Sequence, residues 1–179
     1  KEILEIENSK PVSLEIIADS KYEAISQSKK LYSLGTNVVV KIPITFTNGE
    51  YTTDVIIELS RIGIPLNITA VFSIKQIQKI IDKISETNSI ISVFAGRLYD
   101  IGIDAKDKMF EMSNFIKNHS NCRLLWASPR MIFDVITAIE TKSDIITISH
   151  NLLEKINLFG IDEESYSLDT VKMFYNDAI

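Results

Sequence analysis

The chain has 179 residues, of which 45% are hydrophobic and 24% are charged, and its formal net charge is −5. This composition is typical of a globular protein, and the length suits one domain with a substantial core. The negative net charge argues against a nucleic-acid partner, and no apolar run is long enough to predict a membrane-spanning helix. The single cysteine, Cys122, excludes an internal disulfide and favours a cytoplasmic location. His119, His150 and Cys122 lack the spacing of a metal cluster, so no metal is expected.

Six short aliphatic runs predict β-strands, and longer segments of helical period separate them. The predicted strands are Pro11–Ile17, Asn37–Thr45, Leu66–Phe72, Ile90–Ala95, Arg123–Ser128 and Asp144–Ser149. Strand–helix units in series predict a parallel sheet with helices packed against its outside. No linker or change in composition suggests a second domain.

Three apolar stripes with a spacing of three or four residues predict amphipathic helices between or after these strands. The stripes are Ile74, Ile77, Ile81 and Ile84; Met109, Met112 and Ile116; and Ile132, Ile136 and Ile139. Ser73 is a predicted N-cap for the first of these helices, and Ser167 is one for a last helix over Leu168–Ala178.

The alternation of side chains along the strands favours a closed barrel over an open sheet. Most strands combine an apolar face with a face that carries polar groups, whereas an open sheet covered by helices needs two apolar faces. Trp126 and Ser128, for example, share one face, opposite Leu125 and Ala127. We therefore predict a (β/α)8 TIM-type barrel, with polar groups from several strand ends lining a central site.

Only six of the eight βα units of such a barrel are found in this sequence. Residues 1–8 have the pattern of a helix tail, so we expect 1–179 to be one barrel domain whose first two βα units are missing and either precede this sequence or come from another chain. A chain without those strands leaves two sheet edges unpaired. This count leaves open that residues 1–179 alone are inactive although the parent protein is an enzyme.

Lys41 is a lone charge inside an otherwise apolar strand. A lysine amine taken out of water tends to lose its proton, and the neutral amine is a nucleophile that forms Schiff bases with carbonyl compounds. Two structural alternatives stay open. Lys41 could extend to the rim of the sheet with its charge in water, or it could form a structural ion pair with Glu15.

Five segments together resemble the transaldolase and fructose-6-phosphate aldolase family, whose members form Schiff bases inside an eight-stranded barrel. The segments are VSLEI at 12–16, NVVVKIPIT at 37–45, GIPLNIT at 63–69, SVFAGR at 92–97 and ASPR at 127–130. Each is weak alone, but the five occur in order across nearly the whole chain.

The resemblance implies a role for each inward polar residue. Lys41 matches the Schiff-base lysine, Glu15 and Thr69 match the pair that holds a water for proton transfer, and Asn67 matches the residue that orients a three-carbon unit. Residues that match substrate-binding positions, most of them at the phosphate, are Ser92, Phe94, Arg97, Ser128 and Arg130. Arginine provides a permanently charged planar fork suited to phosphate oxygens.

The implied reaction is transfer of a dihydroxyacetone unit between phosphorylated ketose and aldose sugars, with no metal or organic cofactor. Relatives that only cleave fructose 6-phosphate tend to carry Gln and Tyr where this chain has Glu15 and Phe94, which favours transfer. A lyase and a non-catalytic sugar-phosphate-binding barrel are the alternatives. Two family features have no counterpart here, an aspartate on the first strand and a Thr-Asn-Pro segment on the second. Relatives form dimers or larger rings, so a homo-oligomer is expected.

Several residues also have simpler interpretations. Arg97 could form a surface ion pair with Asp100. Trp126 and Phe94 are the kinds of residue that usually fill a core. Cys122 lies three residues after His119 in a polar turn, and we expect its thiol to be unreactive.

Overall fold

The computed structural model describes residues 2–179. By its internal contacts the chain divides into two compact units, Lys1–Thr147 and Ile148–Ile179. The first unit contains all six strands of the sheet, and the second consists of helical segments.

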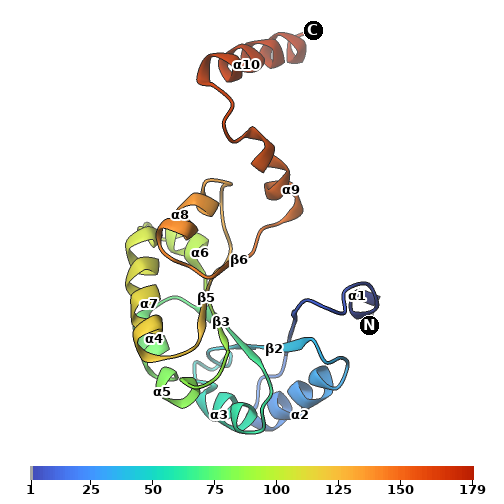
Figure 1. The fold of residues 1–179 in the computed structure, drawn as a ribbon, viewed down its shortest axis with the longest axis vertical. Helices are drawn as coiled ribbons and strands as arrows, with labels where there is room; N and C mark the ends of the chain where they lie inside the picture. The colour runs from blue at the N-terminus through green and yellow to red at the C-terminus, as the bar shows by residue number, and fades with distance from the viewer. Residues whose placement is uncertain (1) are drawn as a thin grey trace. The chain divides into compact units, whose positions relative to one another are not determined.

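The six strands run parallel and lie side by side in the order β1-β2-β3-β4-β5-β6 (Figure 1). They are β1 Val12–Glu15, β2 Val38–Pro43, β3 Leu66–Val71, β4 Ile90–Val93, β5 Arg123–Trp126 and β6 Ile145–Ile146. Helices alternate with the strands, so the first unit is a half-barrel, part of a (β/α)8 barrel. All six predicted strands are confirmed, and each is shorter than predicted.

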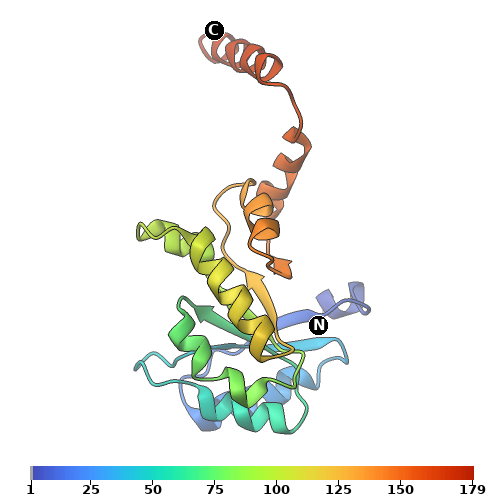
Figure 2. The ribbon, with the colours of Figure 1, turned by 60° about the vertical axis from the view of Figure 1, so that its left-hand side comes forward.

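Most helices of the first unit cover the outer face of the strands, whereas α1 buries no residue. They are α1 Glu2–Ile6, α2 Lys21–Tyr32, α3 Thr53–Arg61, α4 Ile74–Gln78, α5 Ile81–Ile84, α6 Ala95–Asp100, α7 Ala105–His119 and α8 Asp134–Glu140. Figures 1 and 2 show α2, α3, α5, α4 and α7 following one another along the outside of the sheet. Fully buried side chains of the strands, among them Val40, Ile68, Ile91 and Leu124, form the core with these helices.

Two of the predicted helical stripes lie in the core as expected. Met109, Met112 and Ile116 are completely buried on α7. The Ile74–Ile84 stripe forms two short helices, α4 and α5, instead of one. Ser73 caps α4 through a capping box with Gln76, which confirms the predicted N-cap.

The predicted apolar stripe of α8 is only partly confirmed. Ile139 is 68% exposed, and the buried face of this helix carries Asp134, Thr137 and Ala138 instead. The carboxylate of Asp134 accepts hydrogen bonds from the backbone N–H groups of Arg130 (2.6 Å) and Met131 (3.2 Å). These bonds fix a polar residue inward at the start of α8, so Ile132 and Ile136 are only half-buried and Ile139 is exposed.

The predicted faces of β5 are also corrected. Trp126 is fully buried in the core under the helices, whereas Leu125 and Ala127 lie on the inner face with Ile90. The register explains this, because Leu125 pairs with Ser92 and Trp126 pairs with Val93. Ser128 still reaches the inner face, since its positive φ of 60° interrupts the alternation of side chains after the strand.

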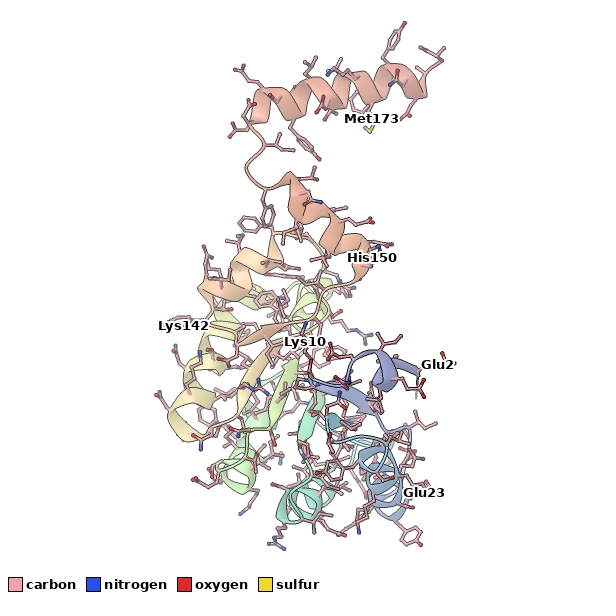
Figure 3. All side chains as sticks on the ribbon, turned by 45° about the vertical axis from the view of Figure 1, so that its right-hand side comes forward. Glu2, Lys10, Glu23, Lys142, His150 and Met173 are labelled. Carbon is pink, nitrogen blue, oxygen red and sulfur yellow. The ribbon has the colours of Figure 1, made fainter. Side chains whose placement is uncertain are left out.

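The second unit contains α9 His150–Leu153, the 3₁₀ helix η1 Glu154–Leu158 and α10 Glu163–Asp177. The N-cap predicted at Ser167 is wrong: the N-cap is Asp162, five residues earlier, and it accepts from the N–H groups of Glu164 and Ser165. Its large apolar side chains, Met173 among them, are exposed (Figure 3). Across residues 2–179, the structure contains no helix long and apolar enough to cross a membrane.

Candidate active site

The inner face of the half-barrel holds a cavity of about 660 Å³. Polar side chains from all six strands or their ends line it: Ser13, Lys41, Asn67, Thr69, Ser92, Arg123, Ser128 and Thr147. Apolar side chains complete its wall, among them Phe94, Leu125, Ala127 and Ile145. The prediction that polar groups near the strand ends face a common interior agrees with this arrangement.

Lys41 and Glu15 form an ion pair inside the half-barrel. They are register neighbours on β2 and β1, and Lys41 Nζ lies 3.1 Å from Glu15 Oε2. The Lys41 side chain is 26% exposed and that of Glu15 is 45% exposed. The amine therefore faces the cavity with a carboxylate within proton-transfer distance, between the fully buried Val40 and Ile42 on the opposite face.

Asn67 is the next residue in the same row, since it pairs in register with Lys41. Ser92 on β4 donates its hydroxyl to Asn67 Oδ1 over 2.7 Å, and Asn67 Nδ2 donates to Ser13 Oγ over 3.0 Å. Ser92 thus contacts Asn67, in addition to lining the cavity. Ser13 was not among the candidate residues, although the two-residue period that places it on the face of Glu15 could have found it.

Thr69 lies on the same face of β3, two residues beyond Asn67. Its side chain is buried, and its hydroxyl has no hydrogen-bond partner among residues 2–179. The register between β3 and β4 shifts between Ile68 and Val71, where Ala70 has a positive φ of 58°. Such bulges re-aim side chains beside active sites. A buried hydroxyl that the protein leaves unpaired is available to a water or a substrate.

Phe94 and Arg97 lie together where β4 passes into α6. Phe94 lines the cavity and packs against Phe72 in a tilted arrangement, with ring centroids 5.8 Å apart. The exposed guanidinium of Arg97 lies 5.1 Å from the centre of the Phe94 ring, a cation–π contact. Arg97 itself is not among the residues that line the cavity of Lys41.

Arg130 lies in a neighbouring cavity of about 610 Å³. It forms an ion pair with Asp100, with Nε 3.1 Å from Oδ1 and Nη2 against Oδ2. The structure thus gives Asp100 a different partner from the Arg97 that the sequence suggested. Gly96 allows α6 to approach this loop, because an added Cβ there would overlap the carbonyl oxygen of Ser128.

Cys122 and His119 lie outside both cavities. The Cys122 thiol is buried and contacts the carbonyl oxygen of Ile84, and burial raises the pKa of the thiol. The His119 ring stacks on Phe115. Among residues 2–179, His, Cys, Asp and Glu side chains form no cluster of three that could hold a metal ion.

Comparison with known proteins decides the family. The sequence profile of the Transaldolase/Fructose-6-phosphate aldolase family matches residues 1–178. The chain belongs to this family. Proteins described as "Probable transaldolase" are similar to it: that of Coprothermobacter proteolyticus is 35% identical over 147 residues, and that of Nitrosopumilus maritimus is 33% identical over 147 residues.

These matches cover 82% and 81% of this chain but only 64% and 63% of the two probable transaldolases, just under two thirds of their length. A solved structure of a mandelate oxidase mutant with a monooxide FMN adduct has the same fold, with a TM-score of 0.58 at 9% identity. The matched region covers 78% of this chain and 48% of the mandelate oxidase chain. The transaldolase family relationship therefore rests on sequence, and the barrel fold agrees with it.

Proposed function

We propose that the protein containing this chain transfers a dihydroxyacetone unit between sugar phosphates through a Schiff base on Lys41. The observation that carries the proposal is that Lys41, which lines a cavity together with Asn67 and Thr69, is paired with the carboxylate of Glu15 at 3.1 Å. Family membership supports an enzyme of this kind. The simple ion-pair interpretation does not account for the unpaired, buried hydroxyl of Thr69.

In the proposed reaction, the amine of Lys41 attacks the ketone carbon of a phosphorylated ketose, and loss of water leaves an iminium ion. Glu15, through a bound water, takes the proton of the hydroxyl on the departing carbon, and the iminium accepts the electron pair of the carbon–carbon bond beyond the adjacent carbon. That bond breaks, and an aldose phosphate leaves. The dihydroxyacetone unit stays on Lys41 as an enamine until an acceptor aldehyde arrives. The imine supplies the electron sink, so the reaction needs no metal or organic cofactor.

Glu15 is the proposed proton carrier. Its carboxylate lies next to the reacting amine, and it can accept the proton that Lys41 loses before attack. Thr69 would hold a water between this carboxylate and the substrate, with the hydroxyl that has no partner within residues 2–179. Asn67 would orient the three-carbon unit through its carboxamide.

Arg97 and Arg130 are the proposed phosphate-binding residues, with Ser92 and Ser128 nearer the reacting carbon. Both arginines follow strand ends on the same side of the half-barrel, where phosphate sites of this architecture commonly lie. Two guanidinium groups can bind the phosphate oxygens by charge-assisted hydrogen bonds. Phe94 would form an apolar wall beneath Arg97.

The test is borohydride reduction of the full-length gene product in the presence of fructose 6-phosphate, followed by peptide mass mapping. We expect one adduct, on the peptide that contains Lys41, and none in a Lys41→Met variant. An adduct on another lysine, or none at all, would overturn the proposal. Lys21 serves as a matched control, since it is also paired with a carboxylate but lies on an outer helix.

A second measurement separates transfer from cleavage. A transferase releases little free dihydroxyacetone until an acceptor aldehyde is added, whereas a lyase releases it without one. We expect dependence on the acceptor. Acceptor-independent release with the same Lys41 adduct would identify a fructose-6-phosphate aldolase and would leave the Schiff-base chemistry intact.

A further inference from the structure

We propose that Ser13 is a positioning residue that holds the carboxamide plane of Asn67 for the reaction. This inference rests on the proposed function, in which Asn67 orients the bound three-carbon unit. Ser13 lies on β1 and Asn67 on β3, so the contact reaches across β2, the strand that carries Lys41.

Two hydrogen bonds hold the carboxamide from opposite ends. Ser92 donates to Asn67 Oδ1 over 2.7 Å from β4, and Ser13 accepts from Asn67 Nδ2 over 3.0 Å from β1. Asn67 and Ser92 are almost completely buried, whereas Ser13 is exposed on the inner face. With both ends held, the amide cannot turn about the bond that joins it to the rest of the side chain.

The remaining hydrogen-bonding capacity of this amide then points into the cavity. A carboxamide has two N–H donors and two acceptor lone pairs on its oxygen, and each of the two serines uses one of them. One N–H is left to donate to a substrate oxygen, and one lone pair is left to accept from a substrate hydroxyl. If the bond to Ser13 is lost, the amide can swing about its bond to Ser92, and these two groups lose their fixed direction.

The position of Ser13 explains why this matters for Lys41. Glu15, Lys41 and Asn67 are neighbours in one row, and Ser13 precedes Glu15 by one step on the same face. The Ser13–Asn67 contact therefore lies beside the amine on the inner face. Small displacements of an orienting group beside a reacting atom reduce turnover more than they reduce binding.

The experiment compares Ser13→Ala, Ser13→Thr and Asn67→Ala in the full-length gene product. We expect Ser13→Ala to lower kcat about tenfold with KM within about twofold of the parent. Ser13→Thr keeps the hydroxyl and should recover most of the loss. Ser26→Ala, on α2 outside the cavity, is the matched control for loss of one serine hydroxyl.

A double-mutant cycle tests whether Ser13 acts through Asn67. We expect Ser13→Ala to cause no further loss of kcat when Asn67 is already alanine. If Ser13→Ala lowers kcat by the same factor in the parent and in the Asn67→Ala protein, the inference is overturned. It is also overturned if Ser13→Ala has the same kcat as Ser26→Ala. The adduct in the parent protein separates the two proposals. If the parent forms no Lys41 adduct, the proposed function fails. If the parent forms the adduct and the Ser13→Ala variant is fully active, only the role of Ser13 fails.

Discussion

Arg130 and Asp100 join the loop after β5 to helix α6 by a two-point contact of guanidinium and carboxylate. Nε of Arg130 lies 3.1 Å from Oδ1 of Asp100, and Nη2 lies against Oδ2. Both side chains are about half exposed. An arginine proposed to bind phosphate is therefore already partly neutralised by a neighbouring carboxylate.

Substitution of Asp100 by Asn should strengthen phosphate binding. The change removes a negative charge that competes with the phosphate for Arg130, so we expect KM for a phosphorylated ketose to fall by roughly threefold at low salt. Exposed ion pairs contribute only about 0–1 kcal/mol, and the unfolding free energy should change little. The comparison is Asp82→Asn on α5, which alters the net charge equally, away from Arg130. A KM that rises, or that falls equally in Asp82→Asn, would show that Arg130 does not bind the phosphate.

Substitution of Thr69 by Val should stabilise the fold and impair catalysis. Valine has nearly the same shape, and it removes a buried hydroxyl with no partner among residues 2–179. A buried unsatisfied polar group costs about 1–3 kcal/mol, so urea denaturation should show a higher unfolding free energy by about 1 kcal/mol. Loss of the proposed water-holding group should lower kcat by about 10²-fold.

The matched control for Thr69 is Thr141→Val. Thr141 is also buried, but its hydroxyl donates to the carbonyl oxygen of Ala138 over 3.1 Å. That substitution should destabilise the fold by about 1 kcal/mol, because it breaks a hydrogen bond. If both substitutions destabilise equally, Thr69 has a structural partner and its hydroxyl is not free for water.

The buried thiol of Cys122 should make stability depend on pH in the alkaline range. Burial raises the pKa of this thiol above its ordinary value of 9.0, so the unfolded chain loses the thiol proton first as pH rises. The unfolded state then binds fewer protons, and the unfolding free energy falls as pH rises above 9.0. Urea titrations at pH 8 and pH 10 should show a larger fall in the parent than in Cys122→Ala. An equal fall in both proteins would mean that the thiol does not contribute.

Alkylation of the Cys122 thiol gives a separate test of its burial. We expect Cys122 to resist iodoacetamide at pH 8 in the folded protein and to react after unfolding, because the thiolate is the reactive form and burial disfavours it. Rapid alkylation of the folded protein would contradict the predicted inertness of this residue.

The amino-acid pattern alone predicted the parallel half-barrel and most of its inner face. Strand alternation has a fixed period of two, so the inward direction of Lys41, Asn67 and Thr69 follows wherever the strands are regular. The order of the five family segments indicated the family before any geometry was known. Where the pattern failed, as on β5 and in part on α8, the strand register or the hydrogen bonds of the Asp134 carboxylate to the preceding loop determined which face is buried.

Only the tertiary structure decided the partners of the polar groups. Arg130 contacts Asp100, and Asn67 reaches Ser13 across an intervening strand. Contacts of this kind depend on the register between strands and on the path of the loops after them. The two-residue period within one strand specifies neither. The amino-acid sequence determined which chemical groups face the interior, and the packing of distant segments determined which of them touch.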